Sequence, residues 1–143
     1  MNVSNQPKLM FQGVDFVNIK FDTYQRYDNK TEIDLKIEPK VFYPENEETI
    51  FKIFMEVSLI CENHFSLTVV GIGNFQLDNK FENEDLKKVF VNANAPAIMF
   101  PYVRAFIATM TANIGNVTGT LTIPTQFFQG ELPEIKTDND TDK

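Results

Sequence analysis

Few residues in this sequence have the types and spacing that catalysis or metal binding requires. The chain contains one histidine, His64, and one cysteine, Cys61. Both could contact a metal ion, but the sequence offers no further soft ligands to complete a zinc site. Cys61 continues the apolar alternation of a predicted strand, which favours a packed small hydrophobic residue over a nucleophile. His64 ends a predicted turn, Cys61–His64, where a solvated imidazole is expected.

Other motifs of catalysis and cofactor binding are also missing from the sequence. It contains no nucleophile–base pair, phosphate-binding loop or metalloprotease motif. Gly71 and Gly73 do not form a dinucleotide-binding fingerprint, because they lie inside a strand pattern and there predict a bulge or bend. The sequence therefore predicts no catalytic residue, no metal site and no cofactor, and a protein that is not an enzyme.

Charge and hydropathy argue against two further classes of protein. The chain of 143 residues has a formal net charge of −7. That acidity opposes nucleic-acid binding, which relies on clustered Lys and Arg. No apolar run approaches the length of a membrane span, and the polar segment Met1–Pro7 does not have the character of a signal peptide. We therefore expect a cytoplasmic protein that is not inserted in a membrane.

Four segments alternate apolar and polar residues with the period of two that is typical of strands, namely Leu9–Phe21, Glu32–Val41, Thr49–Cys61 and Phe65–Leu77. The first segment changes phase once, which predicts a bulge near Phe16 and Val17. The second has one apolar and one charged face, and Pro39 limits its ladder. The third and fourth are close enough along the chain to form a hairpin.

A helix is predicted in the stretch that begins at Ala95. Apolar residues there recur at gaps of three, four and seven and so share one helix face, namely Met99, Val103, Phe106, Ile107, Met110 and Ile114. We expect this stripe to supply core and oligomer contacts. Pro101 fits if it lies in the first turn, and Gly115 fits a left-handed closing residue. A short helix or turn is predicted before it, at Leu86–Asn94.

These elements predict an α+β fold in which one main helix packs on a four-stranded antiparallel sheet. The chain length fits one compact domain, which we place at residues 9–130. Residues 1–8 are polar and are expected to be flexible. Residues 131–143 are polar and acidic without periodicity, which predicts a disordered tail.

The main helix also carries a family resemblance. The run Ile98–Arg104 reads Ile-Met-Phe-Pro-Tyr-Val-Arg and continues with Ile-Ala-Thr-Met at Ile107–Met110. It resembles the helix signature of SecB, the bacterial protein-export chaperone, in which a Leu-Phe-Pro-Tyr-Ala-Arg run opens the main helix. Pro124–Phe127 is similar to the Pro-x-x-Phe element that follows in that family. The resemblance extends from about Phe11 to Phe128.

The resemblance implies a function without covalent chemistry. SecB-like proteins are ATP-independent holdases that assemble as a dimer of dimers, with the main helices between the dimers. Unfolded preproteins wrap around the tetramer along apolar grooves. The residues that we expect to line such a groove are Tyr24, Tyr27, Phe42, Tyr43, Phe127 and Phe128. Packing in the core or between subunits explains each of them equally well. Arg104 is expected to make a structural ion pair.

Two departures from the SecB pattern concern its partner, the motor ATPase SecA. In the family, an acidic patch on the sheet docks the basic tail of SecA through an Asp-x-x-x-Glu pattern in the first strand and a Glu in the fourth. The run Asn18–Asp22 keeps only Asp22 as an acidic residue, Lys20 adds a positive charge, and Thr68 takes the fourth-strand position. The long C-terminal helix that covers the family's groove is not predicted after Phe128. SecA docking at Asp22 is therefore a weak expectation, and a chaperone dedicated to one partner, such as an antitoxin, is the alternative.

Two other classes of function remain open on the sequence. A cone-shaped α+β domain could bind a small ligand or catalyse a reaction between its sheet and its helix. That function would need an enclosed polar pair, for which His64 is the only candidate histidine. An oligomeric structural protein without a client is the other possibility.

Overall fold

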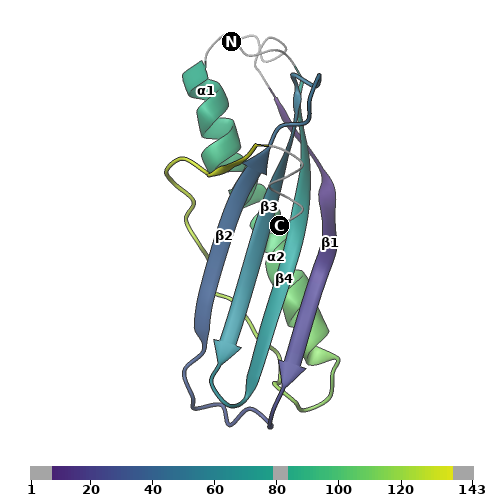
Figure 1. Cartoon of the computed structure of the whole chain (residues 1–143), viewed down its shortest axis with the longest axis vertical. Coiled ribbons are helices and arrows are strands. Elements are labelled where there is room, and N and C mark those ends of the chain that lie inside the picture. The colour runs from purple at the N-terminus through teal and green to yellow at the C-terminus, as the bar shows by residue number, and fades with distance from the viewer. Residues whose placement is uncertain (1–7, 79–83, 137–143) are drawn as a thin grey trace.

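The computed structural model describes residues 8–78 and 84–136. The elements are β1 (Leu9–Thr23), β2 (Asp34–Phe42), β3 (Ile50–Cys61), β4 (Phe65–Leu77), α1 (Glu84–Val89), η2 (Phe90–Asn94), α2 (Ala95–Ala112) and β5 (Glu134–Ile135). The strand order in the sheet is β1-β4-β3-β2-β5 (Figure 1). All neighbours are antiparallel except β2 and β5, which are parallel. The predicted α+β fold with four long strands and one main helix is confirmed, and β5 makes the sheet mixed.

The phase change predicted in the first strand is confirmed as an irregularity of β1. The register between β1 and β4 shifts between Phe16 and Asn18, because Val17 has no partner on β4. A second shift occurs between Phe11 and Val14, where Gly13 adopts a φ of +98°. These shifts keep the apolar residues on both sides of each irregularity on the face that packs against the helix.

The glycines of β4 lie at both irregularities of the β1–β4 ladder, but the extra residues belong to β1. Gly73 pairs with Val14 and Gly71 with Phe16, where the two register shifts occur, whereas the pairing of β4 with β3 is regular. Gly73 also lies under α2, where an added Cβ would come within 2.8 Å of the Met99 Sδ atom. At Gly71 an added Cβ would lie 3.4 Å from Val103 Cγ2. The missing side chains therefore allow the helix to approach the sheet closely.

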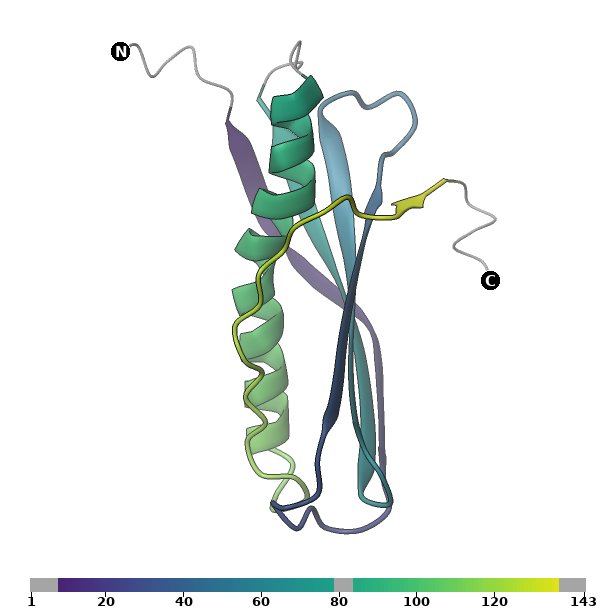
Figure 2. The same cartoon turned by 90° about the vertical axis from the view of Figure 1, so that its left-hand side faces the viewer.

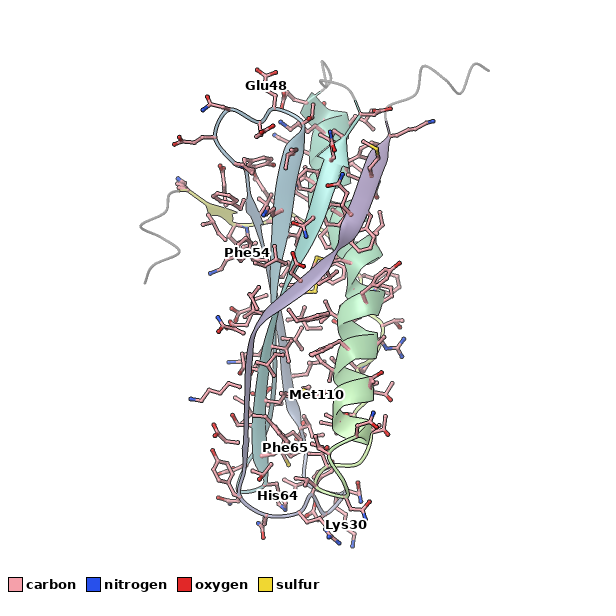
Figure 3. The ribbon with its side chains drawn as sticks, turned by 90° about the vertical axis from the view of Figure 1, so that its right-hand side faces the viewer. Lys30, Glu48, Phe54, His64, Phe65 and Met110 are labelled. Carbon is pink, nitrogen blue, oxygen red and sulfur yellow. The ribbon has the colours of Figure 1, made fainter. Side chains whose placement is uncertain are left out.

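The segments α1, η2 and α2 follow one another as a single helical rod along the long axis of the molecule (Figure 2). Met99, Val103 and Ile107 are fully buried, while Phe106 and Met110 are half-buried against the same core. Figure 3 shows Met110 between the helix and the sheet. The predicted apolar stripe therefore forms the core of the protomer.

The ends of the main helix differ from the prediction. Because α2 continues from η2, Pro101 lies inside the helix rather than in its first turn. Proline removes the hydrogen bond to the carbonyl of Ala97, and both residues are exposed, so water can replace that bond. The helix ends at Ala112, so Ile114 lies beyond it, and Gly115 adopts the predicted left-handed conformation with a φ of +78°.

The chain after α2 forms an extended segment, residues 117–136, which we call the C-terminal strap. It runs back beside α2 and then crosses to the edge of β2 (Figure 2). Its buried side chains are Thr118, Leu121, Ile123 and Leu132. The N–H of Leu121 donates to Thr111 Oγ1 at 2.9 Å. Arg104 donates from Nε to the carbonyl of Ile123, so among the described residues it contacts the strap instead of making the expected ion pair.

The strap also changes the predicted domain limits. Residues 131–136 are ordered: Leu132 is buried, and Val41 donates its N–H to the carbonyl of Pro133 at 2.9 Å. The expectation of a disordered tail therefore fails for residues 131–136, because one apolar side chain and the free edge of β2 hold this segment. Residues 137–143 and 1–7, to which the remaining predictions of disorder apply, lie outside the described part of the chain.

Candidate functional site

The tyrosines predicted to contact clients lie in the β1–β2 loop and differ in their surroundings. Tyr24 is 66% exposed. Tyr27 packs edge-on against Phe65, with ring centroids 5.6 Å apart, and donates its hydroxyl to the carbonyl of Thr31. Desolvation raises the pKa of the Tyr27 hydroxyl above its ordinary value. Tyr27 therefore holds the loop in place, and Tyr24 is free to contact another molecule.

His64 lies at the same end of the molecule, in the β3–β4 turn (Figure 3). Its Nε2 atom is 3.6 Å from the carboxylate of Asp28. That carboxylate accepts hydrogen bonds from the N–H groups of Thr31 and Lys30, which lower the pKa of Asp28 well below its usual range. Cys61 is buried, as predicted, and burial raises the pKa of its thiol.

Among the described residues, the side chains buried between the helix and the sheet are apolar except for Thr111 and Thr118. Thr111 already bonds to the carbonyl of Ile107 and to the N–H of Leu121. In the same described ranges, no three His, Cys, Asp or Glu side chains gather as a ligand set for a metal ion.

Phe42 and Tyr43 lie near the opposite end of the sheet and point to opposite faces. Phe42 packs edge-on against Phe54, with ring centroids 6.3 Å apart, on the face away from the helix. Tyr43 is half-buried beside Phe51, and the ammonium group of Lys87 lies 5.4 Å from its ring centre. Desolvation raises the pKa of the Tyr43 hydroxyl. Tyr43 thus connects the end of β2 to α1.

The phenylalanines of the strap also differ from each other. Phe127 is 96% exposed, whereas Phe128 packs against Phe100 with ring centroids 5.6 Å apart. The predicted client-binding residues therefore lie at three places, namely the β1–β2 loop, the end of β2 and the strap.

An apolar surface that the sequence reasoning missed lies where α2 meets the edge strand β1. We define this α2–β1 surface by residues Phe11, Phe16, Ile19, Ile98, Tyr102 and Phe106. Tyr102 is 54% exposed and packs on Phe11, and Phe106 stacks on Phe16 with ring centroids 4.0 Å apart. Arg104, the only charged residue of α2, is turned to the strap. The scarcity of charge in this helix was the sequence signal for an outer apolar face.

A second apolar surface lies on the face of the sheet away from the helix. We define this open-face patch by residues Val17, Phe42, Phe54, Val70, Ile72 and Ile135. Figure 3 shows Phe54 on this face. A shallow cavity of about 250 Å³ lies here, and Glu38, Lys40 and Glu56 flank its apolar lining. The patch thus combines an apolar centre with a border of both charges.

The remaining predicted residue, Asp22, lies on this same open face near the far end of β1. It is exposed and pairs across the strands with Ser66. Lys20 pairs with Thr68, so the positions compared in the sequence are neighbours in space. The neighbouring positions on this face, Lys20, Ser66 and Thr68, are not acidic.

Comparison with known proteins decides the family. Residues 4–123 match the family described as preprotein translocase subunit SecB. The chain belongs to the SecB family. It is 31% identical over 111 residues to protein-export protein SecB of Orientia tsutsugamushi strain Boryong, a match that covers 75% of this chain and 65% of that protein. The match thus spans slightly less than two thirds of the length of that SecB protein. Over 119 residues the chain is 29% identical to an uncharacterized protein, MJ0357, of Methanocaldococcus jannaschii, covering 78% of this chain and 75% of that protein.

Solved structures share the SecB-like fold. The SecB-like chaperone Rv1957 of Mycobacterium tuberculosis, in complex with a ChAD peptide from the antitoxin HigA1, superposes with a TM-score of 0.65. That match covers 81% of this chain and 86% of Rv1957 at 13% identity. A protein of unknown function from Streptococcus agalactiae gives a TM-score of 0.50 at 13% identity, covering 84% and 99% of the two chains. At such identity these likenesses concern the fold alone.

Membership of the SecB family, which is a family of chaperones, supports a chaperone role for this chain. Within the described ranges, no helix has both the length and the apolar character that crossing a bilayer requires. Residues 113–136, which follow α2, contain no helix. The resemblance to SecB implied a long helix after the main helix, and in this chain the strap follows instead.

Proposed function

We propose that this SecB-family protein is an ATP-independent holdase that binds unfolded polypeptides in the cytoplasm. The observation that carries the proposal is the amount of apolar side chain left uncovered on both layers of the protomer. Contiguous exposed apolar surface of this kind marks an interaction site. Each client side chain that becomes fully buried contributes about 1.5–3 kcal/mol, and several weak contacts on one chain add as avidity. Binding only the unfolded state then withdraws the client from folding and aggregation by mass action.

We further propose that the α2–β1 surface mediates self-association as a dimer of dimers. Its two halves adjoin, because Tyr102 of α2 packs on Phe11 of β1. The β1 strand is also at an edge of the sheet and has no neighbour on its outer side among the described residues. Such an assembly would cover Ile98 and Tyr102 and would leave the strap and the open face available to clients.

Among the predicted client-binding residues, exposure suggests a division of roles. Tyr24 and Phe127 are exposed and would contact the client, as would Phe42, which is half-buried on the open face. The half-buried Tyr27, Tyr43 and Phe128 would hold neighbouring segments in place.

A chaperone dedicated to one partner is the second candidate function. Asp22 and Lys20 are next to each other on the same face of β1. A basic ligand such as the tail of SecA would therefore meet charges of both signs there. A SecB-like chaperone of the same fold, Rv1957, is known in complex with a peptide from an antitoxin. Co-expression with the products of neighbouring genes tests this candidate: a stable complex with one small protein supports it, and restoration of general export in a host that lacks SecB contradicts it.

Suppression of aggregation tests the holdase function itself. Light scattering of a reduced, unfolded test protein should stay low at stoichiometric amounts of the wild-type chain. Phe127→Ala should weaken this suppression, because it removes an exposed aromatic ring, whereas Gln126→Ala on the same strap should not. Unsuppressed aggregation at every ratio of wild-type protein to client would refute the proposal.

A further inference from the structure

The β2 strand has a free edge that is already used, over part of its length, to bind an extended segment. Strand β5 pairs with β2 only at Val41 and Phe42. Residues 34–40 pair with β3 on one side and with no described residue on the other. Figure 1 shows β2 at the side of the sheet, and Figure 2 shows the short yellow strand beside one end of it.

The direction of the backbone groups of β2 follows from one hydrogen bond. Val41 donates its N–H to Pro133 of the strap, so the N–H of Val41 points out of the sheet. Backbone groups alternate in direction along a strand, and therefore the N–H and C=O groups of Leu35 and Ile37 also point outward. The backbone of Pro39 also faces outward, because it lies two residues from Ile37. Proline carries no N–H, so it leaves no unpaired donor there. The free edge thus presents donors at Leu35 and Ile37 and acceptors at both and at Pro39.

The side chains of this edge differ between its two faces. Leu35 and Ile37 are half-buried on the face toward the helix, where they adjoin the core. On the open face the edge alternates acidic and basic residues, namely Asp34, Lys36, Glu38 and Lys40. A strand added here would cover apolar surface with one face and would place the other beside charges of both signs. Such a strand needs apolar and polar residues in alternation.

The strap shows how such a strand fits. Residue Ile135 pairs with Phe42 and reaches the open-face patch, where it lines the shallow cavity. Leu132 is buried on the other side of the sheet, and its N–H donates to the side-chain oxygen of Asn92. The strap therefore places apolar side chains on both faces while its backbone bonds to β2. It is an internal example of an extended peptide bound at this edge.

We propose that the free edge of β2, residues 34–40, binds an extended client segment as an added strand, and that it selects segments in which apolar and polar residues alternate. This inference rests on the proposed holdase function and specifies the class of client segment. Backbone hydrogen bonds supply affinity that does not depend on sequence, and the two faces of the edge supply the preference for alternation. Helical segments, whose apolar residues recur every three or four positions, would not fit.

A second copy of the chain is the weaker occupant of this edge. Two antiparallel β2 strands centred on Ile37 would match their alternating charges, with Asp34 opposite Lys40. In that register Pro39 of each strand would lie opposite Leu35 of the other. Each of these two pairs would lack one backbone hydrogen bond, because proline has no N–H. The same register would also bring the partner's Ile33 against Val41, where β5 already lies. A peptide of a client meets neither restriction, because its register can adjust.

Amide hydrogen exchange of the full-length protein tests the inference directly. The probe is a short synthetic peptide that alternates valine with lysine and glutamate. The comparator has the same composition with its valines at helical spacing. The alternating peptide should protect the amides of Leu35 and Ile37, and the comparator should bind more weakly. Protection confined to other residues would overturn the inference.

A matched pair of variants separates the backbone of Ile37 from its side chain. Ile37→Pro removes the N–H that points outward. It leaves the backbone hydrogen bonds between β2 and β3, because the alternate residues, such as Lys36 and Glu38, make those bonds. It should weaken binding of the alternating peptide about tenfold, since one bond is lost and a client carbonyl is left unpaired. Ile37→Val keeps the N–H and should bind within about twofold of the wild type. Equal affinity of a folded Ile37→Pro variant would overturn the inference; if that variant does not fold, the exchange experiment decides.

The outcomes also distinguish this inference from the proposed function. If the wild type suppresses aggregation but the β2 amides stay unprotected, the holdase function stands and the edge is not its binding site. If the wild type binds no unfolded polypeptide, both fail. If the amides of Leu35 and Ile37 become protected in the free protein as its concentration rises, a second copy occupies the edge, and the inference is wrong.

Discussion

The substitution Gly73→Ala tests whether the glycines of β4 exist to admit the helix. An added Cβ at Gly73 would lie 2.8 Å from Met99 Sδ and 2.8 Å from Phe75 Cε2, closer than such atoms approach in folded proteins. Overpacking of a core costs about 1–3 kcal/mol. Alanine also restricts the conformations of the unfolded chain more than glycine does, which stabilises the folded state by about 0.4–1 kcal/mol. The expected net effect is a loss of about 0.5–2 kcal/mol in the free energy of unfolding.

Urea denaturation measures this loss at a fixed protein concentration. With a slope of about 1–3 kcal/mol per molar, the midpoint should fall by roughly 0.5 M. Gly71→Ala is the graded comparison, because its closest contact would be 3.1 Å, to Val14 Cγ1, and its loss should be smaller. In a Met99→Ala background the contact with Sδ is absent and the contact with Phe75 remains, so the loss of stability caused by Gly73→Ala should become smaller. The resulting coupling between the two sites should exceed about 0.5 kcal/mol.

One result would refute this reasoning. If Gly73→Ala raised the stability of the wild-type chain, and did so equally with Met99 or Ala at position 99, the added Cβ would meet free space. The close approach of α2 to β4 would then not explain why glycine occupies this position.

Three further predictions concern the assembly and the loop end of the molecule. Tyr102→Glu should lower the mass in solution measured by light scattering, whereas Thr125→Glu on the strap should not; an unchanged mass would remove the α2–β1 surface as the interface. Asp28→Ala should lower the urea midpoint at pH 7, and the difference from the wild type should shrink as the pH falls below about 4. The reason is that the pKa of Asp28 is depressed by folding, so its stabilisation is complete above the unfolded-state pKa and is lost below it; a constant difference down to pH 2 would contradict this. The Cys61 thiol should resist Ellman's reagent at pH 8 in the native protein and react in urea, because burial raises its pKa; rapid reaction of the native protein would contradict its placement in the core.

Local signals in the sequence determined most of the sheet and the inner face of the helix. The bounds of β4, Phe65–Leu77, match the prediction because alternation with a period of two fixes which side chains share a face. The irregularity between Phe16 and Asn18 is visible as a change of phase for the same reason. The Phe-Pro-Tyr run of the main helix also carried the family, because a short run with fixed spacing is recognisable without knowledge of its contacts.

The tertiary structure decided what depends on segments that are distant along the chain. Composition predicted disorder for residues 131–136, but the free edge of β2 and the burial of Leu132 order them. The glycines of β4 indicated an irregular ladder, but nothing within the strand indicates that the extra residues belong to β1 or that Met99 passes above Gly73. The exposure of Tyr102 is likewise set by how far α2 covers β1. Periodicity fixes the face on which a residue lies, but only the packing of one element on another determines whether that face is covered, and here the uncovered faces carry the proposed function.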